Sequence, residues 1–261
     1  MKTILFSAFL GLTLGSTAVL AQTPEEQGLA IAVEADRRDQ GWGDSTANMV
    51  MVLRNKAGKE SRRKIRIKNM EVQQDGDKSI SVFDHPADVK GTAFLSHTHS
   101  KTPDDQWLYL PALKRVKRIS SANKSGPFMG SEFAFEDLSS QEVEKYTYKL
   151  LAEESLGDLE MYKIERVPQY EKSGYTRQLS WIDKEHYRVH KIEFYDRKNA
   201  LLKTLESSDF KQYLDKYWRP SKMLMVNHQN GKQTELSWEN YQFGTNLSAD
   251  DFNKSALKRT R

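Results

Sequence analysis

Apolar and polar residues alternate along most of the chain from residue 46 onward. In the segment 48–54 the side chains of Met49 and Met51 fall on one side of an extended backbone. Further along, Ile65 and Ile67 alternate with cationic residues in the same way. A period of two residues is typical of β-strands whose two faces meet different environments. The pattern therefore predicts strands rather than helices for most of the chain.

The same alternation recurs at short intervals, separated by turn residues. The turn sequences at 74–77 and 230–231 are of the kind that joins antiparallel neighbours. About a dozen strands at this spacing indicate a large antiparallel sheet. The predicted strands span residues 48–54, 64–72, 79–83, 93–97, 107–110, 113–119, 143–152, 159–167, 177–182, 187–195, 201–209, 217–228 and 234–243.

Helices are few in this pattern. Pro24, followed by Glu25 and Glu26, predicts the start of an amphipathic helix over 24–40. Shorter helices are expected near 86–89, 131–138 and 249–252. We therefore expect a mainly β fold, in which a large curved antiparallel sheet forms an unclosed barrel and a few helices lid its concave face. Such an arrangement leaves room for an apolar hollow.

The first 21 residues have the pattern of a secretory signal peptide. Lys2 supplies the positive start, residues 4–14 are mostly apolar, and Ala21 ends a run suited to cleavage. The apolar stretch is short for a membrane span, which needs roughly 20 residues. We expect cleavage near Ala21, with a retained anchor as the alternative. The mature chain, 22–261, has no Pro/Gly/Ser-rich linker and is predicted to form one domain.

The sequence contains no cysteine. An exported chain of this length can bury a core large enough to fold without disulfides. Together with the signal-peptide pattern, this favours the bacterial periplasm as the location.

Composition narrows the classes of function. Hydrophobic residues make up 38% of the chain and the formal net charge is only +4, which argues against a nucleic-acid binder. The sequence has no phosphate-binding glycine pattern and no Gly-x-Ser-x-Gly turn. His97 and His99 form only a pair, whereas a metal site needs three or four converging ligands. We expect no enzyme, cofactor or metal. An envelope hydrolase would require histidines and acids to gather in one cleft.

The segment 107–138 combines features suited to holding an apolar molecule. A predicted strand pair and a cationic stretch precede a glycine-containing loop with the side chains Phe128, Met129, Phe133 and Phe135. These side chains form either a lid that yields to an acyl chain, since Met suits adaptable contacts, or a fixed loop that fills the core. The sequence leaves both interpretations open.

Apolar residues that share strand faces extend this candidate site. The further cavity candidates are Met49, Met51, Trp107, Tyr109, Trp181, Met223, Met225 and Trp238. Each could equally belong to an ordinary packed core. The cations Arg115, Lys117 and Arg118 lie beside the aromatic loop. They are either a solvated outer face or a docking surface for anionic headgroups or an acidic partner, which allows transient contact with a membrane surface.

Several stretches of the chain resemble one bacterial family. The block Trp107–Ile119, the run Phe128-Met129-Gly130-Ser131-Glu132-Phe133, and the segments Val189–Lys203 and Trp218–Trp238 resemble outer membrane lipoprotein-sorting proteins of the LolA/LolB-like superfamily. The resemblance implies an unclosed β-barrel whose concave side is covered by helices and encloses a hydrophobic cavity. It also implies a role in outer membrane biogenesis, with transport of an acyl-chain-bearing molecule across the periplasm as soluble partner of an RND-type inner-membrane transporter.

These observations predict a periplasmic carrier or chaperone that binds the acyl chains of a lipid or lipoprotein in a hydrophobic cavity. Burial of hydrocarbon, at roughly 0.8 kcal/mol per methylene, would supply the binding energy. The alternative is an envelope interaction module that binds no lipid and docks through its basic strands. An unfilled interior would favour the carrier, and a filled one would favour the module.

Overall fold

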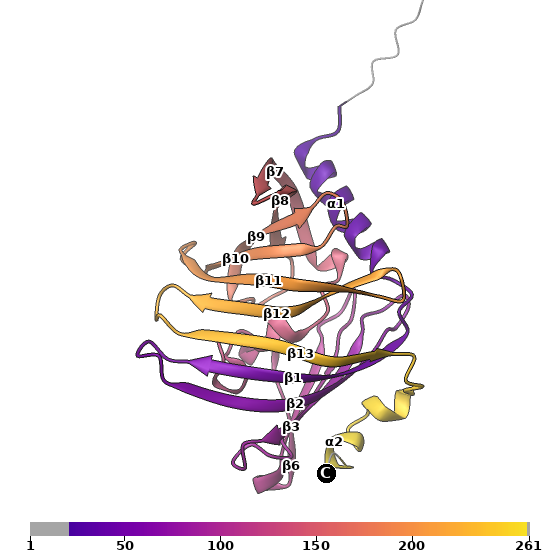
Figure 1. Cartoon of the computed structure of the whole chain (residues 1–261), viewed down its shortest axis with the longest axis vertical. Coiled ribbons are helices and arrows are strands. Elements are labelled where there is room, and N and C mark those ends of the chain that lie inside the picture. Colours follow the sequence, from indigo (N-terminus) through magenta and orange to yellow (C-terminus); the bar gives the residue numbers. More distant parts are fainter. Residues whose placement is uncertain (1–20, 260–261) are drawn as a thin grey trace, which may run out of the picture.

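The computed structural model describes residues 21–259. The predicted signal peptide falls almost entirely on residues 1–20, outside the described residues, and stays a prediction. A single antiparallel sheet of 13 strands dominates the fold and curves strongly around its own axis (Figure 1). The mainly β fold class predicted from the sequence is confirmed.

The strands follow the predicted alternation closely. They are β1 (Asp44–Arg54), β2 (Glu60–Met70), β3 (Lys78–His85), β4 (Ala93–His97), β5 (Asp105–Leu110), β6 (Arg115–Arg118), β7 (Tyr146–Leu156), β8 (Leu159–Pro168), β9 (Tyr175–Asp183), β10 (Val189–Asp196), β11 (Leu201–Tyr213), β12 (Tyr217–Asn227) and β13 (Gln233–Phe243). Their order in the sheet is β6-β5-β4-β3-β2-β1-β13-β12-β11-β10-β9-β8-β7. Because β6 and β7 stand at opposite edges, the barrel is unclosed, as expected.

The order of the strands gives the chain an unusual path between β6 and β7. From β1 the chain steps outward to the edge strand β6, and from β7 it steps back until β13 pairs with β1. Residues 119–145, which we call the inner segment, must therefore connect one edge of the sheet to the other. This segment contains only short 3₁₀ turns: η2 (Ser121–Asn123), η3 (Phe128–Gly130), η4 (Phe135–Leu138) and η5 (Val143–Lys145).

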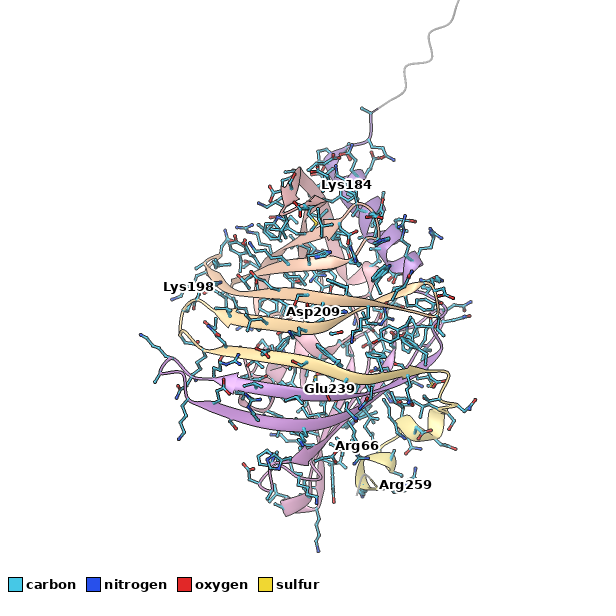
Figure 2. All side chains as sticks on the ribbon, viewed as in Figure 1. Arg66, Lys184, Lys198, Asp209, Glu239 and Arg259 are labelled. Carbon is cyan, nitrogen blue, oxygen red and sulfur yellow. The ribbon has the colours of Figure 1, made fainter. Side chains whose placement is uncertain are left out.

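The inner segment packs inside the curve of the sheet, on the side that we call the inner face. Phe128 and Phe133 are 2% and 3% exposed and belong to one apolar cluster with residues from both halves of the sheet, among them Met51 and Met225. The ring of Phe128 lies 5.1 Å from that of Phe94. The protein's own side chains therefore fill much of the inner face. Figure 2 shows polar side chains on the opposite, outer side, such as Asp209 on β11 and Glu239 on β13.

Helix α1 (Pro24–Arg38) covers the part of the inner face next to β7. Thr23 caps its first turn in a capping box with Glu26. Ile31 packs against Ile164 and Ile182. Gly28 allows close contact, because a Cβ at this position would lie 2.7 Å from the backbone of β7. The helix predicted over 24–40 is present and ends two residues earlier.

The C-terminal end of the chain lies on the outer side of the sheet. The turn η6 (Ala249–Phe252) and helix α2 (Ala256–Arg259) bring Phe252 and Leu257 against Ile80, Leu95 and Trp107. These strand residues alternate with Phe83, Phe94 and Leu108, which face inward. The strands β3–β5 are therefore covered on both faces, by the inner segment inside and by η6 and α2 outside, whereas we expected helices on the concave face alone. The helix expected near 86–89 is a turn. Within residues 21–259, no helix is both long and apolar enough to span a bilayer.

Candidate functional site

A buried ion pair fixes the inner segment to the middle of the sheet. Nζ of Lys203 on β11 donates to Oδ2 of Asp137 at 2.7 Å, and the two side chains are 4% and 7% exposed. Asp137 also accepts hydrogen bonds from the Tyr175 hydroxyl at 2.8 Å and from the backbone N–H of Ala134 at 2.7 Å. A buried carboxylate with this many donors is well compensated. The pair therefore holds η4 against β9 and β11.

Glu132 attaches the tip of the inner segment to the ends of three strands. Its carbonyl oxygen accepts from Nζ of Lys203 at 2.8 Å. Its carboxylate Oε2 accepts from Nδ2 of Asn227 at 2.7 Å, and its backbone N–H donates to Oγ1 of Thr234 at 2.9 Å. These bonds place the tip beside the turn between β12 and β13.

Glu136 holds the inner segment to the loop between β8 and β9. Its carboxylate accepts from the hydroxyls of Tyr170 and Ser173, at 3.1 and 2.9 Å, and from the N–H of Gly174 at 2.8 Å. A Cβ at Gly174 would lie 2.9 Å from this carboxylate. Burial raises the pKa of Glu136, although the hydrogen bonds oppose the shift. The inner segment is thus held by a few polar contacts around an apolar centre.

The structure brings together most of the apolar candidates named from the sequence. The inner-face cluster contains Met49, Met51, Phe128, Met129, Phe133, Phe135, Met223, Met225 and Trp238. Trp107 and Tyr109 lie instead on the outer side, in the cluster under α2. Trp181 packs with Met161 and Leu179 in a separate cluster. These three aromatic residues are not brought to the inner face.

The three candidate docking cations lie on the edge strand β6. Arg115, Lys117 and Arg118 are all exposed, and Arg118 forms an ion pair with Asp105. Charged side chains on an edge strand also discourage unwanted pairing with another sheet. The cations are therefore available to a partner, and their position has a structural explanation as well.

Among the hollows that open to solvent at the surface of the described residues, two are of similar size. One, of about 240 Å³, lies where the inner segment meets the β1–β2 and β12–β13 turns, and it is lined by Leu53, Gly130, Glu132 and Thr234 among others. The other, of about 270 Å³, lies across β10–β12, with Lys191, Glu193 and Glu206 in its wall. The first hollow is the surface end of the seam between the inner segment and the sheet.

Sequence reasoning missed a polar group on the inner face of β8 and β9. Arg166, Gln178 and Ser180 are 6%, 2% and 1% exposed. Arg166 pairs in register with Gln178, and Ser180 follows on the same side of β9. The only sequence signal is that Arg166 has the same parity as Ile164 in an alternating strand. From the sequence alone, that signal does not show whether the even-numbered residues of this strand lie on the inner or the outer face of the sheet.

Acidic residues gather where the other end of the inner segment meets β3. The Asp77 N–H donates to Oγ of Ser140 at 3.3 Å, and this hydroxyl donates to Glu142 at 2.6 Å. Burial raises the pKa of Asp77 to about 7, and the negative charges of Glu142, Glu71 and Asp39 add to the shift. This end of the segment is therefore sensitive to protonation.

The histidines do not all converge on one cleft. His99 is paired with Asp75 at 2.8 Å near the end of β4, whereas His190 contacts Asp183 at 3.0 Å on β9. Among residues 21–259, no three His, Cys, Asp or Glu side chains converge as metal ligands. The arrangement described above can bind or cover apolar groups.

Comparison with known proteins gives close structural relatives. A family model described as "Uncharacterized protein" matches residues 75–259. A candidate outer membrane lipoprotein-sorting protein domain from Vibrio parahaemolyticus is 58% identical with a TM-score of 0.89, over 90% of this chain and 100% of that one. A DUF1329 family protein from Desulfovibrio piger is 31% identical, with a TM-score of 0.85 over the same shares of the two chains.

A more distant structure shares the fold. A LolA superfamily protein from Nitrosomonas europaea is 22% identical, with a TM-score of 0.70, over 90% of this chain and 100% of that one. The comparison with curated proteins found no match.

Proposed function

The chain belongs to the family of the lipoprotein-sorting domain and the DUF1329 protein described above, within the LolA-like superfamily, and we propose that it is a periplasmic carrier for acyl chains. Its cargo would be a lipid or a lipoprotein, and it would catalyse no reaction. The proposed location rests on the signal-peptide pattern of residues 1–21.

The observation that carries this proposal is the way in which the inner face is covered. Phe128 and Phe133 complete its apolar cluster, yet they belong to a segment of short turns that joins the two edges of the sheet. If this segment moves aside, Met51, Phe83 and Met225 become the floor of an apolar groove. A dozen methylenes laid on that floor would contribute roughly 10 kcal/mol, which can offset the loss of the segment's contacts.

A reversible lock on the inner segment tests the proposal. Because the chain has no cysteine, Glu132→Cys with Thr234→Cys introduces a single thiol pair at a contact between the segment and β13. We expect the reduced protein to bind a fluorescent fatty acid and the oxidised protein to bind it at least tenfold more weakly. The same sample after reduction is the control.

Two results would contradict the proposal. Equal binding by the oxidised and reduced forms would show that the inner segment does not gate the interior. Absence of binding by the unmodified protein, with no acyl ligand found by native mass spectrometry after isolation from the periplasm, would exclude the carrier function.

The apolar side chains that fill the inner face favour the second candidate, an envelope interaction module. In that function the exposed cations Arg115 and Arg118 on β6 would dock on an acidic partner, and an RND-type inner-membrane transporter is the partner that the family resemblance suggests. Charge reversal at both positions should then abolish capture of the partner, whereas Phe133→Asp should leave it intact. If the protein is a carrier, Phe133→Asp should abolish binding of a fatty acid, and charge reversal at Arg115 and Arg118 should leave that binding intact.

A further inference from the structure

Arg166 of β8 is a buried cation that lacks a buried anion. Its side chain lies on the inner face beside Gln178 and Ser180 of β9, under the part of the inner segment that contains Gln141. Within residues 21–259, no carboxylate lies within ion-pair distance of its guanidinium. By contrast, Arg177 on the neighbouring outward position is 3.5 Å from Glu165.

The hydrogen bonds of this group are also incomplete. Nη1 of Arg166 donates to Oε1 of Gln141, but Nε and Nη2 donate to no atom of the described chain. Oε1 of Gln178 and Oγ of Ser180 likewise have no partner there. The great majority of buried polar atoms in proteins are hydrogen-bonded, and an uncompensated buried charge is strongly unfavourable. The closed protein therefore keeps a polar group whose binding capacity is unused.

The identity of the unused atoms specifies a ligand chemistry. Nε and Nη2 form one edge of the planar guanidinium, and this edge presents two parallel N–H donors to a carboxylate or a phosphate. The Ser180 hydroxyl can add a third donor. Oε1 of Gln178 can only accept, so it suits a hydroxyl or N–H next to the oxyanion.

We propose that Arg166, Gln178 and Ser180 form a headgroup site that binds the oxyanion, phosphate or carboxylate, of a hydrocarbon-bearing ligand. The inference rests on the proposed carrier function and adds the polar end of the cargo. Gln141 belongs to the inner segment, so movement of that segment removes the cover from both Arg166 and the apolar floor. Hydrocarbon and headgroup sites then open together.

The surroundings of Arg166 strengthen its selectivity for an anion. The ring of Tyr146 lies 5.3 Å from Cζ of Arg166, and burial raises the pKa of the Tyr146 hydroxyl, which keeps it neutral. An anion is therefore not opposed by a neighbouring phenolate. Electrostatic attraction in a site shielded from water is stronger than at the surface.

Matched amphiphiles test the site on the delipidated mature protein. Dodecyl phosphate, dodecanoate and dodecanol share one hydrocarbon chain, and each would displace a neutral fluorescent probe. We expect the wild type to prefer at least one of the two anions over the alcohol by about tenfold or more, as expected for a charge-assisted hydrogen-bonded pair. The phosphate and carboxylate arms identify which oxyanion is preferred.

Arg166→Met should abolish this preference and leave the binding of dodecanol unchanged. Arg177→Met, which removes the same charge from the outer side of the adjacent strand, should behave as the wild type. Arg166→Lys should give an intermediate preference, because lysine retains the charge and loses the two-pronged edge. Thermal unfolding without ligand should show Arg166→Met to be at least as stable as the wild type, since an uncompensated buried charge is removed.

The outcomes separate this inference from the carrier function. If Arg166→Met binds the anions with the wild-type preference, or if the variant is markedly less stable, the headgroup site is wrong and the carrier function stands. If the wild type binds the anions and the alcohol equally, the headgroup site is also wrong. If neither the wild type nor any variant binds any of the three compounds, the carrier function itself is wrong.

Discussion

Helix α1 and the inner segment cover neighbouring parts of the same inner face by different means. The helix is regular, is capped by Thr23, and makes its contact through apolar side chains such as Ile31. The inner segment also buries apolar side chains, among them Phe128 and Phe133, but it has no regular helix of its own and is fixed in addition by the buried Lys203–Asp137 pair. Loss of a buried ion pair leaves an uncompensated charge inside the protein, so the position of the inner segment should respond sharply to loss of that pair. For the proposed carrier function, the inner segment is therefore the gate that we expect to open.

Among the changes that test this comparison, replacement of Lys203 should have the largest effect on the free energy of unfolding. Lys203→Met leaves the Asp137 carboxylate buried without its cation, which should lower the free energy of unfolding by about 3–5 kcal/mol. Urea denaturation measures the change. Lys222→Met is the matched control on the next strand, because its pair with Asp209 is exposed (57% and 55%) and its loss should change the free energy of unfolding much less. Equal effects of the two changes would show that the inner segment does not depend on the pair.

A change at the contact between α1 and β7 should have the second largest effect on the free energy of unfolding. In an isolated helix, Gly28→Ala would be stabilising by about 1 kcal/mol. Here the new methyl group would lie 2.7 Å from the backbone of Lys149 and Leu150, so the helix must move. We expect a net loss of about 1–3 kcal/mol in the free energy of unfolding.

The sign of the change shows which effect of Gly28→Ala is larger, the gain in helix propensity or the clash with β7. A rise in the midpoint of urea denaturation would mean that α1 does not press on β7. Leu29→Ala, on the exposed side of the same helix, should change the free energy of unfolding by no more than about 0.5 kcal/mol.

The sequence predicted the regular elements because each follows from a local pattern. Alternation through Met49 and Met51 indicated β1, and Pro24 with the acids after it indicated α1. The strand expected over 113–119 is shorter, because Pro111–Leu113 forms a 3₁₀ turn and Lys114 adopts a left-handed conformation with φ of 50°. Such interruptions break the period of two only locally, so the order of strands along the chain was still predictable.

The path of the inner segment could not be predicted in this way. Residues 119–145 have no period, and their position depends on the pairing of β13 with β1, which joins the two ends of the chain. The side of the sheet on which Trp107 lies could not be predicted either. Both faces of β5 are buried, one under the inner segment and one under α2, so burial does not distinguish them. Arg166 resembled any outward cation of an alternating strand until register placed it beside Gln178.

The smallest predicted effect concerns pH and the end of the inner segment near Asp77. Its pKa rises from an ordinary value of about 3.9 in the unfolded chain to about 7 in the folded protein, mainly through burial. The folded state therefore binds a proton more tightly than the unfolded state. The stability that this proton contributes is present at low pH and is lost as pH rises from about 4 to about 7.

Asp77→Asn should remove this contribution to the pH dependence. The amide retains the oxygen that accepts from the Val72 N–H and carries no charge toward Glu142 and Glu71. We expect the thermal midpoint of the variant, relative to the wild type, to be a few degrees higher at pH 8 than at pH 5. Asp158→Asn, in an exposed turn, should give the same difference at both values. An equal difference for Asp77→Asn at the two pH values would contradict the prediction, because it would mean that burial does not raise the pKa of this carboxyl.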